Sequence, residues 1–206
     1  MKTTVNAAIN AHKILVSPLL LLLMAYYDNW NATSFLYLGL HGTYTLLWLM
    51  KQSIYPDKRF EQVLPLRIAF FTPFLPLAGY YIAPYLLISG HTIVPPVIFA
   101  IAPCIYTLGI FLHYVGDAQK YFILRERKQL ITDGLFARTR NPNYLGEILI
   151  YGAFALLSWH WLPVFILAGW VAYFFINMAK KDRSMARHDD FANYKKKTGK
   201  LFPKLF

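Results

Sequence analysis

Long stretches without charge alternate with short polar segments along the chain. Six stretches contain no Asp, Glu, Lys or Arg: residues 14–27, 34–50, 68–88, 92–112, 148–159 and 162–178. A helix needs roughly 20 apolar residues to cross about 30 Å of hydrocarbon, and the shorter stretches reach this length only with their flanking residues. The pattern predicts an all-α, polytopic integral membrane protein with about six transmembrane helices, although five or seven also fit the stretches alone.

The placement of the basic residues favours six. The net charge is +11, and the Lys and Arg residues fall before the first stretch, after the second, after the fourth and after the sixth. The intervening segments 28–33, 89–91 and 160–161 contain none. With six spans, all basic segments face one side of the membrane, which the positive-inside rule assigns to the cytoplasm together with both termini. The excess of positive charge therefore predicts membrane lipids rather than nucleic acid as partner, in a bacterial inner membrane or the endoplasmic reticulum.

Two features of the middle of the chain bear on function. Seven prolines lie between residues 65 and 103. Proline is tolerated inside a membrane only where neighbouring groups satisfy the freed carbonyls, so these residues indicate either kinked packing or a cavity for an apolar substrate. Segment 116–142 is the longest predicted connection, with a helical stretch at 117–128 and a turn at Asp133-Gly134.

The motif GLFARTRNPNYLGE at 134–147 carries the candidate chemistry. Glu147 lies about one turn inside the predicted fifth span, where a carboxylate is costly and marks a functional candidate. Asn143 lies four residues earlier on the same helical face. Asn143 and Tyr144 occupy the first turn, whose free N–H groups favour an anion or amide ligand. Arg138 and Arg140 just before it are suited to paired hydrogen bonds with phosphate.

Residues from two other segments are expected on the same side of the membrane. Asp117 is predicted to close the fourth helix. The tail after residue 178 is predicted to continue the last helix at least to Tyr194 and then to fold back, with Arg183 and Arg187 on one helical face. Together these groups predict a pocket with a basic rim and carboxylates below, suited to a large, partly anionic cofactor. The alternative is that Glu147 pairs with Arg140 or Arg183 only to join helices.

The motif, the segment from Asp117 to Gln119 and the sequence FANYKKKTGKLFP resemble the C-terminal domain of the steroid 5-alpha-reductase-like membrane proteins, over about residues 108–206. The resemblance implies an NADPH site. It implies cofactor contacts for Asp117, Asn143 and Glu147 and for the tail residues Arg183, Arg187 and Tyr194. It also implies a single membrane domain over 1–206, in which helices of 1–107 form the substrate cavity and 108–206 bind the cofactor.

The sequence Arg140-Asn141-Pro142-Asn143-Tyr144-Leu145-Gly146 also resembles part of the motif of isoprenylcysteine and phospholipid methyltransferases, which bind S-adenosylmethionine. Glu147 directly after Gly146, and Asp117, favour the reductase family. The tail has Asp182-Arg183 where the methyltransferases carry a Glu-Glu pair. A methyltransferase using S-adenosylmethionine is therefore the alternative function, and a non-catalytic lipid-binding or scaffold protein is a further one.

The N-terminal half offers His41 and Tyr44, three residues apart on one face of the predicted second helix. The 5-alpha-reductases hold the substrate ketone with a Gln-Glu pair on an early helix, and this sequence has no such pair there. His41 and Tyr44 are the candidate catalytic residues that would polarise a carbonyl, the alternative being that His41 is a packing residue. No His, Cys or carboxylate cluster has metal-ligand spacing, so no metal is expected.

The predicted function is a membrane-embedded, NADPH-dependent reductase of a conjugated double bond in an apolar lipid, steroid or sterol-like substrate. Hydride would reach the electron-poor alkene carbon while an acid stabilises the enolate oxygen.

Overall fold

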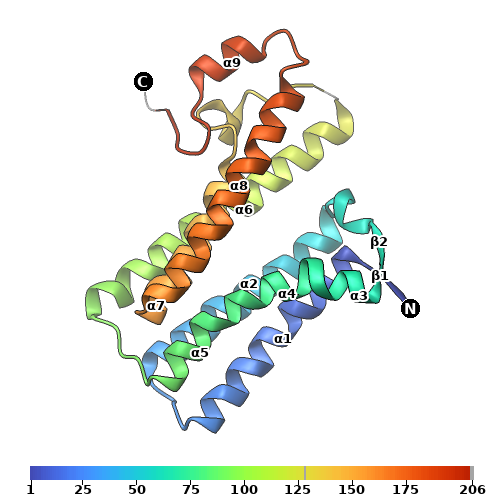
Figure 1. Cartoon of the computed structure of the whole chain (residues 1–206). Coiled ribbons are helices and arrows are strands. Elements are labelled where there is room, and N and C mark those ends of the chain that lie inside the picture. Colours follow the sequence, from blue (N-terminus) through green and yellow to red (C-terminus); the bar gives the residue numbers. More distant parts are fainter. Residues whose placement is uncertain (128, 205–206) are drawn as a thin grey trace. The chain divides into compact units, whose positions relative to one another are not determined.

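The computed structural model describes residues 1–127 and 129–204. Its long helices are α1 (Val5–Tyr26), α2 (Ala32–Ile54), α6 (Pro96–Glu126), α7 (Pro142–Ser158) and α8 (Trp161–Met185) (Figure 1). Shorter helices are α3 (Leu66–Ala69), α4 (Leu75–Ala78), α5 (Ile82–Ser89) and α9 (Phe191–Lys197), with single turns η1 (Lys58–Glu61), η2 (Phe70–Phe74), η3 (Gly79–Tyr81) and η4 (Gly134–Ala137). The predicted helix 117–128 includes residue 128, and the predicted domain 1–206 also includes residues 205 and 206. These three residues lie outside the described part of the chain.

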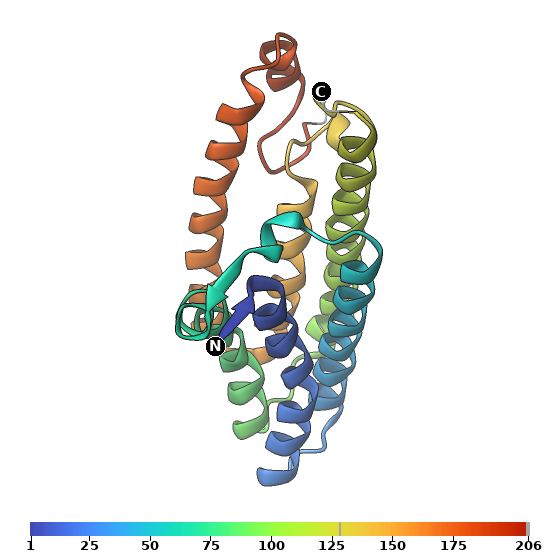
Figure 2. The same ribbon diagram turned by 90° about the vertical axis from the view of Figure 1, so that its right-hand side faces the viewer.

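The all-α prediction is confirmed, with one small addition. Two three-residue strands, β1 (Lys2–Thr4) and β2 (Val63–Pro65), form an antiparallel ribbon in which Lys2 pairs with Pro65. Figure 2 shows the two arrows side by side. No pattern in the sequence indicated this ribbon, because each strand is too short to show the period-2 alternation of a sheet.

Four helical segments in the described part of the chain are long and apolar enough to cross a membrane: Val5–Tyr26, Leu66–Ser89, Pro96–Glu126 and Trp161–Met185. The membrane character of the protein is therefore supported. Two of the six predicted spans are not among them. Helix α7 has 17 residues and is only about 26 Å long. Helix α2 is long enough but carries His41, Lys51 and Gln52.

The chain divides into two compact units. Unit 1 comprises Met1–Pro103 and Ala153–Ile166, and unit 2 comprises Cys104–Gly152 and Leu167–Phe206. The boundary between Pro103 and Cys104 lies near residue 107, where the sequence analysis divided the chain, but unit 1 also includes the end of α7, the turn after it and the start of α8.

Unit 1 is built on the packing of α1 against α2. Thr4 caps α1 by accepting a hydrogen bond from the Ala7 amide, and Asn31 caps α2 through the Ser34 amide. The two helices are joined where Thr45 donates to the Lys13 carbonyl (3.1 Å) and Trp48 donates to Asn10 (2.9 Å). These bonds satisfy some of the polar groups of an interface that also buries His12 and Lys13 of α1 and His41 of α2.

The third apolar stretch is helical but irregular. Between Leu66 and Ser89 the chain passes through α3, the π-turn η2, α4, the 3-10 turn η3 and α5. Pro73 lies inside the π-turn, and Pro76 and Pro84 lie in α4 and α5. Because each proline removes one backbone donor and crowds the preceding turn, short segments of different pitch replace one regular helix.

Unit 2 consists of parts of α6, α7 and α8 with α9 and the tail folded over one end (Figure 1). Its core is formed by Leu145 of α7, Phe174 and Met178 of α8, and Leu201 of the tail. The tail is therefore part of the core, and the prediction that it folds back is confirmed.

Two predicted boundaries in unit 2 are wrong. Asp117 does not close a helix, because α6 continues to Glu126, and the connection to α7 is correspondingly shorter than 116–142. The tail does not extend the last helix to Tyr194. Helix α8 ends at Met185 and α9 begins at Phe191 after a turn, which lets α9 return its apolar residues Phe191 and Tyr194 to the protein.

Candidate functional site

Helices α6 and α7 approach each other unusually closely, and glycines make this possible. A Cβ atom at Gly146 would overlap the His113 amide nitrogen and lie 2.5 Å from the Gly109 carbonyl oxygen. A Cβ atom at Gly109 would lie 2.8 Å from the Gly146 carbonyl oxygen. Small residues that bring backbones together are the usual means of packing membrane helices. The contact brings the residues around Gly109–Gly116 and Asn143–Glu147 against one another.

Four polar side chains lie along this contact. His113 and Asp117 are four residues apart on α6, and Asn143 and Glu147 are four apart on α7, so each pair shares a helical face. The Asn143 side-chain amide donates to Asp117 (3.1 Å). His113 Nδ1 lies 3.2 Å from the Asn143 carbonyl oxygen. We call His113, Asp117, Asn143 and Glu147 the polar cluster.

The polar cluster retains hydrogen-bonding capacity. His113 Nε2 and Asn143 Oδ1 are buried and have no partner in the described structure. Contact with the Asn143 carbonyl requires the proton on Nδ1, so Nε2 of a neutral ring accepts a hydrogen bond and Nε2 of a charged ring donates one. Buried polar atoms are normally paired. Two such atoms, on residues that contact each other and the Asp117 carboxylate, indicate a place for a polar ligand.

The structure brings Asp117 and Asn143 into contact, and Glu147 follows Asn143 on the same helical face; the sequence analysis did not include His113. The signal was available in the sequence. His113 lies four residues before Asp117, so a helix through Asp117 would have placed both on one face.

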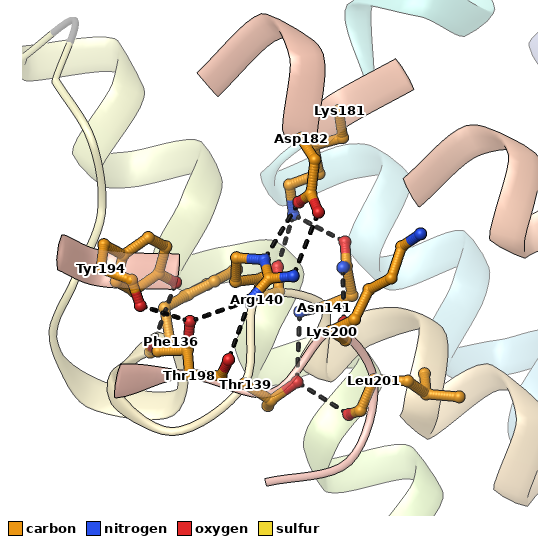
Figure 3. A network of polar contacts seen from close by, with 10 residues as sticks. All are labelled: Phe136, Thr139, Arg140, Asn141, Lys181, Asp182, Tyr194, Thr198, Lys200 and Leu201. Atoms are coloured by element: carbon orange, nitrogen blue, oxygen red, sulfur yellow. Dashed lines mark hydrogen bonds and ion pairs between the residues drawn. The ribbon is translucent and has the colours of Figure 1, made fainter. Parts of the chain in front are cut away.

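Arg140 has a different environment from the one predicted. Only 4% of its surface is exposed. Its Nε and Nη2 donate to the two carboxylate oxygens of Asp182 at 3.0 and 3.1 Å, and Nη1 donates to the carbonyl of Thr198 at 2.8 Å (Figure 3). Arg140 and Asp182 therefore form an ion pair that joins the motif to α8.

Arg138, two residues earlier, is exposed. Its backbone is fixed, because its carbonyl oxygen accepts hydrogen bonds from the amides of Gly199 (3.0 Å) and Lys204 (2.9 Å). The side chain remains available at a defined position. Of the two arginines in the motif, Arg138 is thus the one able to contact a phosphate from solution.

The tail holds the backbone of the motif on several sides. The Thr139 hydroxyl donates to the Leu201 carbonyl and the Asn141 side-chain amide donates to the Lys200 carbonyl, both at 2.7 Å. From α8, the Lys181 ammonium donates to the carbonyl of Arg140 (2.8 Å) and to Asn141 Oδ1 (3.1 Å). Figure 3 shows these bonds converging on residues 139–141.

Tyr194 belongs to this support. Its hydroxyl donates to the Phe136 carbonyl (2.9 Å). Burial raises the pKa of Tyr194 to about 12, with the Arg140 charge lowering it and the Asp182 charge raising it. The phenol is therefore a neutral donor at physiological pH. Tyr144 is also packed, its ring 5.0 Å from that of Phe174.

The other predicted site residues are distributed differently. Arg183, in α8, and Arg187, in the turn after it, are exposed. His41 and Tyr44 lie in α2 of unit 1 and are each 1% exposed. The His41 ring stacks on Phe154 with ring centroids 4.4 Å apart, and the Lys13 ammonium lies 3.9 Å from the centre of the Tyr44 ring. Among the described residues, no group of three His, Cys, Asp or Glu side chains could hold a metal ion.

A family model described as "Protein of unknown function (DUF1295)" matches residues 42–198. The chain belongs to this family. The DUF1295 match includes the whole polar cluster, all nine predicted cofactor residues and Tyr44, but begins one residue after His41. No curated protein matches the chain.

Proposed function

We propose that this protein is a membrane-embedded, NADPH-dependent reductase of a conjugated double bond in an apolar lipid, steroid or sterol-like substrate. The observation that carries the proposal is the polar cluster, in which unpartnered buried atoms of His113 and Asn143 lie next to Asp117 at a close helix contact. The resemblance of the motif around Asn143 and Glu147 to the steroid 5-alpha-reductase-like proteins supports the choice of cofactor.

The groups present fit the polar parts of a nicotinamide nucleotide. Asp117 and Glu147 can accept hydrogen bonds from ribose hydroxyls or an amide donor. His113 Nε2 and Asn143 Oδ1 offer two further buried positions. Arg138 is exposed for a phosphate, with Arg183 and Arg187 as further candidates for such contacts. When bound, NADPH would supply the hydride.

The protein's own residues would bind and orient the cofactor and would act as an acid toward the substrate. The cluster on α6 and α7 would orient the cofactor from a rigid helix pair. An acid, Tyr44 or His41 in our proposal, would stabilise the enolate oxygen of the reduced substrate. Because both side chains are almost fully buried, a substrate would reach them only if helices of unit 1 separate locally.

Replacing Glu147 by glutamine tests the cofactor site. Glutamine keeps the shape but has one acceptor oxygen where the carboxylate has two. We expect NADPH affinity to fall about ten- to a hundred-fold, corresponding to roughly 1–3 kcal/mol for a buried donor left unpaired. NADPH and S-adenosylmethionine should be titrated against both proteins in detergent, with thermal unfolding recorded in parallel.

The matched control is Glu126→Gln, the same chemical change at an exposed position at the end of α6. It should leave the affinity unchanged. Unchanged NADPH affinity with a lowered melting temperature for Glu147→Gln would contradict the proposal and leave a structural role. A selective loss of S-adenosylmethionine binding would point to a methyltransferase, and absence of binding by either ligand to a scaffold.

A soluble nucleotide requires the cluster to open toward the cytoplasm, so we propose six spans with both termini on that side. The basic loops support this topology. Exposed aromatic residues lie at the loops that lack basic residues: Tyr26 at the end of α1 and Trp30 after it, and Trp159 before α8 and Trp161 at its start. Aromatic residues of this kind are enriched at membrane–water interfaces.

Cysteine labelling tests this topology. In a Cys104→Ala background, a membrane-impermeant thiol reagent should label exposed His91→Cys and His160→Cys in intact cells. It should label Lys195→Cys only after permeabilisation, since α9 follows the basic end of α8. Labelling of position 195 in intact cells, or protection of positions 91 and 160, would contradict six spans with cytoplasmic termini.

A further inference from the structure

The tail of unit 2 presents an aromatic ring to the outside. Phe202 is 70% exposed although its neighbour Leu201 is buried in the core. Fraying does not explain the exposure, because the backbone around Phe202 is fixed. The carbonyls of Lys200 and Leu201 accept hydrogen bonds from Asn141 and Thr139, and the Lys204 amide donates to the Arg138 carbonyl.

Gly199 shapes this turn. A Cβ atom at Gly199 would overlap the Phe202 carbonyl, so the chain turns back closely on itself and leaves the Phe202 side chain on the outer side. A large apolar ring held outward at a fixed position normally marks a surface that contacts another apolar phase.

The position of Lys200 indicates that this apolar phase is the membrane. Its ammonium lies 5.7 Å from the centre of the Phe175 ring on α8. Phe175 is 41% exposed and lies in the apolar part of a candidate membrane span, one turn before the charge-free stretch ends at Met178. Lysine at such a position extends its alkyl chain along apolar surface and keeps its charge at the headgroup level. The tail therefore runs at the level where α8 leaves the hydrocarbon.

The charge of this surface indicates the kind of lipid. Residues 179–206 contain nine Lys or Arg and three acidic residues, and one of the three, Asp182, is paired with Arg140. Lys195, Lys196 and Lys197 of α9 are exposed, as is Lys204, whose ammonium donates to the Lys196 carbonyl (2.7 Å). Clusters of basic residues next to a transmembrane helix attract anionic lipid headgroups.

We propose that residues 200–204 form a docking surface for anionic phospholipids, with Phe202 inserted among the headgroups and acyl chains between Lys200 and Lys204. None of its residues belongs to the polar cluster, and the inference does not depend on the identity of the cofactor. Because the same segment holds Thr139 and Asn141 through its carbonyls, lipid contact would also reinforce the backbone that presents Arg138.

The test uses the full chain in lipid nanodiscs. In a Cys104→Ala background, Phe202→Cys is labelled with an environment-sensitive fluorophore, and phosphatidylglycerol is titrated into phosphatidylcholine discs. We expect the emission to shift to the blue and to be quenched by spin-labelled acyl chains as phosphatidylglycerol increases. In the labelled protein, Lys200→Gln and Lys204→Gln should each raise the fraction of phosphatidylglycerol that is needed for half of the spectral shift. The increase should be up to about five-fold for each charge lost near the surface.

Lys58→Gln is the matched control, because it removes an exposed lysine from η1. It should leave the titration unchanged. Soluble glycerol phosphate added to phosphatidylcholine discs should not reproduce the shift, and a shift there would replace the lipid surface with a simple anion site. Equal spectra in both lipids, or titrations unaffected by the two tail lysines, would overturn the proposal.

Discussion

Replacing Arg140 by leucine is expected to lower the free energy of unfolding by about 3–5 kcal/mol, the usual cost of removing one partner of a buried ion pair. Asp182 would lose its charged partner with only 15% of its side chain exposed. The Thr198 carbonyl would also lose its donor. The loss should appear as a lowered unfolding midpoint in detergent, measured by denaturant titration or thermal unfolding.

Arg138→Leu is the control within the same motif. The Arg138 side chain is exposed and only its carbonyl joins the tail, so stability should change by no more than about 0.5 kcal/mol. This variant should instead weaken binding of NADPH more than of NADH, if Arg138 contacts the phosphate that distinguishes them. Equal destabilisation by the two substitutions would contradict the different roles assigned to these arginines.

A second control isolates the pair itself. Arg140→Leu combined with Asp182→Leu removes both charges, and such replacements of buried ion pairs by apolar residues are often close to neutral. Most of the stability lost in Arg140→Leu should therefore return in the double variant. If it does not, Arg140 stabilises the protein mainly through Thr198 and the tail.

The regular parts of this fold could be predicted because their signals are local. Uncharged stretches locate the long helices, since hydrocarbon excludes charged side chains whatever the tertiary structure. The common face of Asn143 and Glu147 could also be predicted, because it depends only on their spacing and on the helical period.

The structure differs from the sequence-based predictions where contacts between distant parts of the chain determine the conformation. Nothing in the local sequence distinguishes Arg138 from Arg140. In the folded protein the tail contacts the Arg140 side chain, which is buried, while the Arg138 side chain stays exposed. The end of α8 at Met185 also depends on the tail, because a continuous helix to Tyr194 would carry Phe191 and Tyr194 away from the protein they pack against. Asp117 looked like a helix end because charge usually marks the end of an apolar run, but α6 extends beyond it as a polar helix.

Gly146→Ala is expected to be strongly destabilising, although alanine is the better helix former. The added methyl group would meet backbone atoms, the His113 amide nitrogen and the Gly109 carbonyl oxygen, which cannot move aside as a flexible side chain can. Helices α6 and α7 would have to separate. We expect a loss of about 3 kcal/mol in the free energy of unfolding, the upper end of the usual cost of overpacking.

Gly169→Ala in α8 provides the matched comparison. A Cβ atom there meets nothing within 4 Å, so alanine should be neutral or stabilise the helix by roughly 0.5–1 kcal/mol. Any Gly146→Ala protein that remains folded should also bind NADPH more weakly, because separation of α6 from α7 moves His113 and Asp117 away from Asn143 and Glu147. Retained cofactor affinity in that variant would show that ligand binding does not require both helices, and the polar cluster would then not be the cofactor site. Equal stability of the two alanine variants would mean that α6 and α7 are not in backbone contact at Gly146.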